Sequence, residues 1–138
     1  MKSIELDEGY IPYIYLDSLN HPTFGIGHLI TPQDPEYGLP LGTYVSEERI
    51  QDAFYDDLEI VYEGLEYLYG IIWIEEVESV LANMAFNLGI RGLSRFRKFN
   101  NAILNEDWHR AAREGRDSLW YTQVPNRAER LMRRLENI

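Results

Sequence analysis

The chain has 138 residues, 45% of them hydrophobic, no cysteine and a formal net charge of −10. This size and composition predict one compact folding domain. They exclude intrinsic disorder, a disulfide framework and a cysteine-based metal site or nucleophile. The acidic charge also argues against nucleic acid as a ligand, because proteins that bind it usually carry a dominant basic surface.

The charge is unevenly distributed along the chain. Residues 1–90 hold 17 acidic and two basic residues, whereas residues 91–138 hold six acidic and 11 basic ones. The basic segment is compatible with solvated helix faces or with a patch that holds an anionic polymer. The first residues lack the apolar segment of a signal peptide, and the longest apolar run, 67–74, is far shorter than the roughly 20 residues that span a membrane. We therefore expect a protein that starts in the cytoplasm of the producing host cell and has no stable membrane association.

The N-terminal part predicts a helix followed by a β-hairpin. Residues 2–8 favour a short helix that Gly9 ends. Two β-type runs follow, 13–16 and 23–30, on either side of a polar turn at 17–22.

The second β-type run alternates between two kinds of side chain. One face holds Phe24, Ile26, His28 and Ile30, and the other holds Thr23, Gly25, Gly27 and Leu29. The first face can bury a core, whereas the second is almost bare backbone. Glycine weakens a strand unless something must approach closely, so this second face is a candidate floor for a ligand. The alternative is that the glycines only permit a twist or a bulge.

The rest of the chain is predominantly helical by pattern. Residues 31–45 are rich in proline and glycine and predict a loop, and Ser46 then caps a helix that extends to about Tyr69. The later helices are marked by a stripe that ends at Gly89, a start at Ser94, a cap at Asp107 and a first-turn proline at Pro125.

These elements predict an α+β fold in a single domain. We expect a small lobe over 9–45, a connecting helix over 46–69 and a helical lobe over 70–138, with the helix 2–8 packing near the helical lobe. A cleft between two such lobes is a common position for a ligand.

Three residues form a candidate catalytic group at the start of the chain. Glu8 ends the first helix, Asp17 ends the first strand, and Thr23 begins the second strand, so Asp17 and Thr23 should face each other across the turn. Two carboxyl groups in unlike environments are what the hydrolysis of a glycosidic bond commonly needs. Taken alone, an acidic residue at a helix end and another at a turn are common in any protein.

The full string of residues resembles the phage lysozymes, a family of glycoside hydrolases. The resemblance lies in Leu6–Gly9, Ile14–Asp17 and Thr23–Leu29, and the spacing of Glu8, Asp17 and Thr23 matches the family without a gap. Two later groups match in the same order along the chain. They are Asn83, Met84, Phe86 and Gly89, and then Ser118, Trp120, Tyr121, Gln123, Pro125, Asn126, Arg127, Ala128 and Arg130.

The resemblance implies a lysozyme-like fold and a reaction. The expected enzyme is an endolysin, a muramidase that hydrolyses the β-1,4 bond between N-acetylmuramic acid and N-acetylglucosamine in peptidoglycan, which leads to cell lysis. Glu8 would be the general acid, and Asp17 and Thr23 would hold the attacking water on the opposite face of the sugar, so that the anomeric centre is inverted. The resemblance implies no cofactor, and we expect peptidoglycan as the partner of a monomer.

The family also implies roles for residues around the catalytic group. Arg127 matches an arginine that lies close to the acid, and His28 and Asp57 match a structural ion pair. Leu29 and Phe86 match positions that contact substrate, to which the candidate ligand floor adds Gly27.

The chain departs from the family pattern at several points. A well-known member has serine and asparagine at two substrate-contact positions where this chain has Phe99 and Glu114, and that member is basic. These differences leave the substrate subsites and the salt optimum open.

Other interpretations remain beside the muramidase. A non-catalytic or virion-associated module would bind peptidoglycan without cutting it, and a lytic transglycosylase would not need Asp17 to handle water. His21, His28 and His109 lack the spacing of metal ligands on a helix, so we expect no metal site. The three tryptophans, Trp73, Trp108 and Trp120, are expected in the core.

Overall fold

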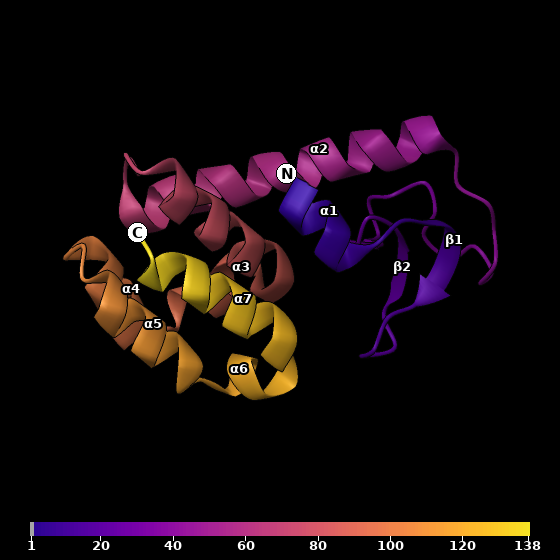
Figure 1. The fold of residues 1–138 in the computed structure, drawn as a ribbon. Helices are drawn as coiled ribbons and strands as arrows, with labels where there is room; N and C mark the ends of the chain where they lie inside the picture. Colours follow the sequence, from indigo (N-terminus) through magenta and orange to yellow (C-terminus); the bar gives the residue numbers. More distant parts are fainter. Residues whose placement is uncertain (1) are drawn as a thin grey trace. The chain divides into compact units, whose positions relative to one another are not determined.

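The computed structural model describes residues 2–138 and has an α+β fold. The chain divides into two compact units, residues 1–59 and residues 60–138, called unit 1 and unit 2 below. Unit 1 contains a three-stranded antiparallel sheet, and unit 2 is helical (Figure 1). In the part of the chain that the structure describes, no helix combines the length and the apolar character needed to cross a membrane.

Unit 1 begins with the predicted short helix. Helix α1 covers Lys2–Glu8, and its Ile4 side chain is only 2% exposed. Gly9 ends the helix because its φ of 79° lies in the left-handed region, and its N–H still donates to the Glu5 carbonyl oxygen at 2.9 Å. This ending places the Glu8 side chain at the last helical position.

The sheet differs from the predicted hairpin, because the second β-type run forms two strands. The strands are β1 (Ile11–Leu16), β2 (Pro22–Gly25) and β3 (His28–Leu29), in the order β1-β2-β3. Gly25 and Gly27 both have φ of 67°, a conformation that turns the chain between β2 and β3. A single alternation over 23–30 was therefore wrong, because the reversal at 26–27 interrupts the period of two.

The register also corrects the expected pairing of Asp17 with Thr23. Tyr15 is the residue opposite Thr23, and Leu16 is opposite Pro22. Asp17 lies just beyond the end of β1, where its N–H donates to the His21 carbonyl oxygen at 3.0 Å. Thr23 therefore pairs two residues earlier along β1 than the sequence pattern suggested.

The segment 31–45 is a loop, as predicted, and it returns to the sheet at its end. Tyr44 forms an isolated bridge with Tyr13, and Val45 is buried. Helix α2 then covers Glu47–Tyr69, which confirms the predicted long helix, and the boundary between the two units falls within it.

Unit 2 contains the remaining helices of the described chain. They are α3 (Glu75–Ser94), α4 (Arg97–Leu104), α5 (Trp108–Arg116), α6 (Leu119–Gln123) and α7 (Pro125–Glu136). Figure 1 shows α4 to α7 in orange to yellow, and α5 packs against both α4 and α7. Buried apolar side chains from α3, α5 and α7, including Leu81, Ala112 and Leu131, form the core.

The helix boundaries of unit 2 confirm most of the predicted signals. Gly89 breaks α3 with φ of 76°, Asp107 caps α5 by accepting from the Arg110 N–H at 3.2 Å, and Pro125 begins α7. Ser94 was wrong as a helix start, because it ends α3 and α4 begins only at Arg97.

The tryptophans divide between core and surface. Trp120 is 2% exposed, as expected, and donates from Nε1 to Asn87 Oδ1 at 2.8 Å. Trp73 is 84% exposed, so its predicted place in the core was wrong. It lies in the segment between α2 and α3, where no helix period directs its ring inward.

Candidate active site

Glu8 lies against the backbone of Gly27. A Cβ atom added to Gly27 would stand 2.5 Å from Glu8 Oε1 and 3.2 Å from Glu8 Cβ. Any side chain at position 27 would therefore displace the carboxylate. The sequence predicted that a ligand approaches this glycine; the close neighbour in the structure is the Glu8 side chain, and contact with a ligand stays a prediction.

Gly25 has a different neighbour and does not belong to the predicted ligand floor. A Cβ on Gly25 would stand 2.7 Å from Cγ2 of the buried Ile50. Gly25 is thus a packing glycine inside unit 1. The two glycines were placed on one face by the alternation, but the turn between β2 and β3 separates their surroundings.

Asp17 and Thr23 both hold the backbone of His21. Asp17 Oδ1 accepts hydrogen bonds from the N–H groups of Leu19 at 2.9 Å and His21 at 2.8 Å. The Thr23 hydroxyl donates to the His21 carbonyl oxygen at 2.8 Å, and the residue is 2% exposed. Although the two residues are not opposite each other in the sheet, this shared partner fixes both side chains at the mouth of the hairpin.

The hydrogen bonds leave one acceptor on each side chain for other use. Both bonds to Asp17 go to Oδ1, while Oδ2 lies 3.6 Å from the exposed His21 Nδ1. The Thr23 hydroxyl donates its only hydrogen to the His21 carbonyl oxygen, and the hydroxyl oxygen can still accept a hydrogen bond. The chemistry that this arrangement allows is the acceptance of hydrogen bonds by Asp17 Oδ2 and Thr23 Oγ1, and the acceptance of a proton by Asp17 alone.

The pKa of Tyr15 depends on the carboxylates of the site. Burial raises the pKa of the Tyr15 phenol, and the negative charges of Glu8 and then Asp17 raise it further. Burial and the two carboxylate charges thus all disfavour the phenolate form of Tyr15.

His28 lies between two carboxylates. Its Nδ1 is 2.8 Å from Asp57 Oδ2 and its Nε2 is 2.9 Å from Asp34 Oδ2. Burial lowers the pKa of His28, but the hydrogen bonds and charges of Asp57 and Asp34 outweigh that effect and raise the pKa above its usual value. Only the doubly protonated ring can donate to both carboxylates at once. The pair of His28 with Asp57 that the resemblance implied is thus present.

The network continues into the loop, and the sequence analysis missed this part. Arg49 donates to both oxygens of the buried Glu36, at 2.9 and 3.0 Å, and to Asp34 Oδ1 at 3.1 Å. Its guanidinium also lies 5.4 Å from the centre of the Phe24 ring. Arg49 is one of only two basic residues in the first 59. An isolated cation in an acidic segment was the signal that could have indicated an ion-pair network.

The expected substrate-contact residues differ in exposure. Leu29 in β3 is 49% exposed, and Phe86 in α3 is partly buried. Phe99 is 2% exposed and packs edge-on against Phe96 with ring centres 6.0 Å apart, so it belongs to the core of unit 2. Glu114 is partly buried in α5.

Arg127 is held by a buried partner within unit 2. Its Nε donates to Asn83 Oδ1 at 2.8 Å, and its Nη2 lies 3.3 Å from the Asn83 carbonyl oxygen. Asn83 has no exposed surface. Both residues come from segments that carry the resemblance, and their hydrogen bonds join α3 to α7 across 44 positions of the chain.

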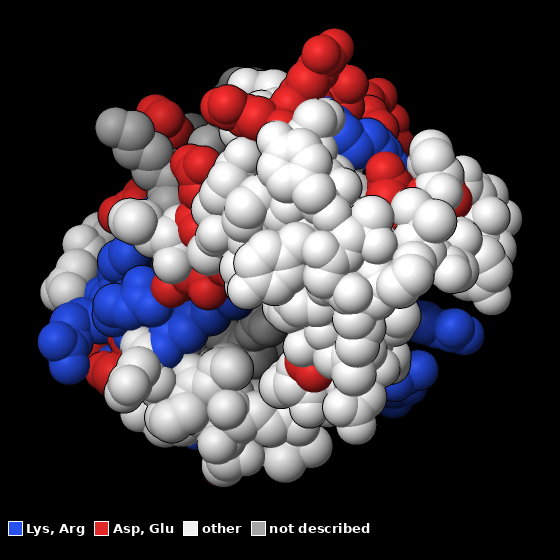
Figure 2. Space-filling view, turned by 90° about the vertical axis from the view of Figure 1, so that its right-hand side faces the viewer, with Lys and Arg blue, Asp and Glu red and all other residues white. Residues whose placement is uncertain are grey.

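The net negative charge of the molecule lies in unit 1. Residues 1–59 hold 12 acidic and two basic residues, whereas residues 60–138 hold 11 of each, so the whole net charge of −10 lies in unit 1. On the face drawn in Figure 2, acidic side chains gather along the upper edge, and the basic side chains form separate groups. An anionic substrate would therefore meet a repulsive field from unit 1.

Comparisons with known proteins place the chain in a family. It is 31% identical to the pre-baseplate central spike protein Gp5 of Enterobacteria phage T4 over 91% of the chain, which corresponds to a quarter (25%) of the length of that protein. It is 28% and 24% identical to the probable T4-type lysozymes 2 and 1 of Dictyostelium discoideum, over 94% and 96% of the chain and 88% and 91% of those proteins. The Phage lysozyme family itself matches residues 5–137. This protein belongs to the phage lysozyme family.

Proposed function

We propose that the protein is a muramidase that hydrolyses the β-1,4 bond between N-acetylmuramic acid and N-acetylglucosamine with inversion at the anomeric carbon. Membership of the phage lysozyme family supports a lysozyme-like peptidoglycan hydrolase. The observation that carries the finer assignment is the arrangement in unit 1. One carboxylate is packed against a glycine backbone, and a second carboxylate and a hydroxyl are fixed on a common residue.

Glu8 is the proposed general acid. It ends a helix whose stop at Gly9 fixes its position, and the lack of a side chain at Gly27 leaves the space that its carboxylate occupies. In this role it donates its proton to the glycosidic oxygen as the bond to the anomeric carbon breaks. A positioned acid of this kind contributes about 10²–10⁴ in rate.

Asp17 and Thr23 are proposed to position the attacking water. Asp17 Oδ2 and Thr23 Oγ1 are the acceptors that their hydrogen bonds to His21 and Leu19 leave over. A water that donates to both has its lone pair directed away from them, toward the sugar carbon. Its proton passes to Asp17 as the new C–O bond forms, so the step ends with Glu8 as the carboxylate and Asp17 protonated. Proton exchange of both groups with solvent then restores the starting enzyme.

The surrounding residues are proposed to support this group. The His28, Asp34 and Asp57 network ties β3 to the loop and to α2, and it is assigned to the scaffold of unit 1. Arg127 keeps the supporting role that the family gives it, with its guanidinium oriented by Asn83. Gly27, Leu29 and Phe86 remain the proposed substrate contacts.

The experiment that tests the function is product analysis on purified peptidoglycan with wild type and Glu8→Gln. The wild type should release new reducing ends, and mass spectrometry should show the addition of one water per cut. Glu8→Gln should reduce the rate at least about 100-fold. The control is Glu5→Gln on the same helix, which should retain activity. Anhydro-muramic acid in the products would identify a lytic transglycosylase, and full activity of Glu8→Gln would remove Glu8 from the mechanism.

A second candidate is a virion-associated lysozyme domain. The observation that favours it is the 31% identity to a phage protein whose name describes a central spike. Under this proposal the same chemistry would act on the wall from a phage particle, in place of release of a free enzyme from the cytoplasm. Detection of the protein in purified virions would separate the two, and binding to peptidoglycan without new reducing ends would indicate a non-catalytic module.

A further inference from the structure

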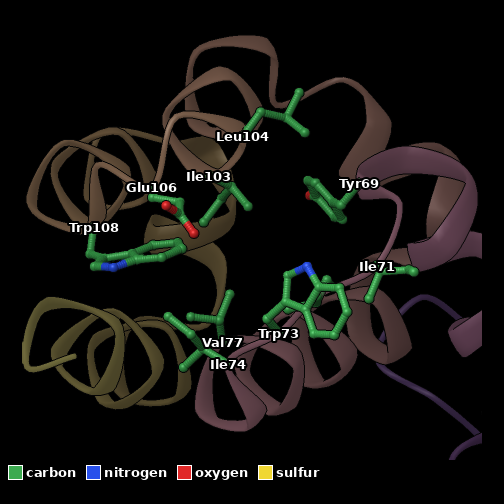
Figure 3. Close-up of a pocket in the computed structure, with 10 residues that line it drawn as sticks. Tyr69, Ile71, Trp73, Ile74, Val77, Ile103, Leu104, Glu106 and Trp108 are labelled. Carbon is green, nitrogen blue, oxygen red and sulfur yellow. The ribbon is translucent and has the colours of Figure 1, made fainter.

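Unit 2 contains a small pocket beside the segment between α2 and α3. The pocket is also lined by residues at the junction of α4 and α5. Its volume is about 130 Å³. In Figure 3, Trp108 and Glu106 lie on one side of the pocket, and Tyr69, Ile71 and Trp73 lie on the other. None of the residues that line it belongs to the proposed catalytic group.

The walls of the pocket are aromatic and aliphatic. Trp73 lines the pocket although it is 84% exposed, so it is not part of the core, and Trp108 is partly buried. The hydroxyl of Tyr69 donates to Asn100 Oδ1, and burial raises the pKa of this phenol. Because that hydroxyl is already used, Tyr69 offers the pocket its ring.

Glu106 is the only charged residue among those that line the pocket. Within residues 2–138, its carboxylate has no hydrogen bond or ion pair with another residue. A carboxylate beside the Trp108 indole and across the pocket from the Trp73 indole, with no cationic side chain among the residues that line the pocket, is a complementary environment for a cation.

The backbone at Glu106 is part of the turn that ends α4. Its φ is 54°, in the left-handed region where glycine is the usual residue. It follows the C-terminal end of α4, where the Asp107 N–H donates to the Ala102 carbonyl oxygen and closes the helix. The helix ending therefore accounts for the left-handed backbone, and a glutamate at this position carries the conformational cost that glycine would avoid.

We propose that this pocket binds an alkylammonium group, with Glu106 supplying the negative charge and Trp73, Trp108 and Tyr69 supplying aromatic faces. The volume admits an ammonium head with a few attached carbon atoms. The shared chemistry covers a free quaternary amine and the side-chain ammonium of a diamino acid in a peptide.

The test follows the indole N–H signals of Trp73 and Trp108 by NMR during titration with two probes. Choline represents a free quaternary amine, and Nα-acetyl-lysine amide represents a side-chain ammonium. Each is paired with a neutral analogue of similar shape, 3,3-dimethyl-1-butanol for choline and Nα,Nε-diacetyl-lysine amide for the lysine derivative. We expect saturable shifts with at least one cation and binding of its neutral analogue at least about fivefold weaker.

Two variants make the proposal sharper. Glu106→Gln should weaken cation binding about fivefold or more, whereas Glu63→Gln, an exposed acid on α2, should leave it unchanged. Glu106→Gly should relieve the left-handed strain and raise the melting temperature while cation binding is lost. No shift with either cation, or equal binding of cation and neutral analogue, would overturn the proposal. These results do not depend on peptidoglycan hydrolysis, so they can fail or succeed apart from the proposed function.

Discussion

The Gly27 backbone and the Glu8 side chain pack so closely that a single added carbon would stand 2.5 Å from the carboxylate oxygen. Two separate features of this position require glycine. It adopts φ of 67°, which L-residues rarely adopt, and it leaves the volume that Glu8 occupies. The proposed acid is therefore positioned by the absence of a side chain on the neighbouring turn.

Gly27→Ala should lower kcat strongly and the free energy of unfolding only slightly. The strained φ should lower the free energy of unfolding by about 1 kcal/mol. Displacement of the Glu8 carboxylate by about 1 Å should lower kcat about 100-fold. Reducing-sugar kinetics and denaturant unfolding measure the two effects.

Gly38→Ala is the matched control for this variant. Gly38 has φ of 84°, and no atom lies within 4 Å of its added Cβ. It should lose a similar amount of stability and keep its kcat. Equal kcat values for the two variants would show that the contact with Glu8 does not set the catalytic geometry.

The His28 network should make stability depend on pH in two directions. The pKa of His28 is raised in the folded chain, so its contribution is fully present below the unfolded value of about 6.5 and is lost as pH rises through the folded value. For Asp34, burial raises the pKa, but the hydrogen bonds from Thr31 and His28 lower the pKa by a larger amount. The net lowering gives a contribution present above about 3.9 and lost as pH falls through the folded value.

The unfolding free energy should therefore decline on both sides of a window of about pH 4 to 6.5. Urea unfolding between pH 3 and 9 measures it. Asp57→Asn should lower the pKa of His28 and flatten the decline above pH 6.5. An unchanged slope in this variant would mean that the charge of Asp57 does not hold the proton on His28.

Activity should rise with salt from very low ionic strength to about 0.1 M, where the Debye length is about 10 Å. The reason is that unit 1 carries the whole net charge of −10 and peptidoglycan is itself anionic. Rates on purified peptidoglycan in a series of NaCl concentrations measure this. A steady fall with salt would show that the basic residues of 91–138 dominate substrate contact.

The sequence alone determined the elements whose signals are local. The stop at Gly9, the long helix up to Tyr69, the break at Gly89 and the cap at Asp107 each depend on backbone freedom or on a side chain next to the helix end. The family resemblance was also available from the sequence, because a fixed spacing of Glu8, Asp17 and Thr23 survives without knowledge of the fold.

The tertiary structure decided which groups meet. Two glycines two positions apart looked equivalent, but one faces Ile50 and the other faces Glu8, because the turn between β2 and β3 reverses the chain. The ion pair of Arg49 with Glu36 and the pocket lined by Trp73 likewise depend on residues outside helices and strands. Glu36 and Trp73 both lie in segments that carry no period. Local pattern fixes backbone conformation over a few residues, whereas contacts between distant residues depend on how the whole chain packs, and only the folded coordinates contain that information.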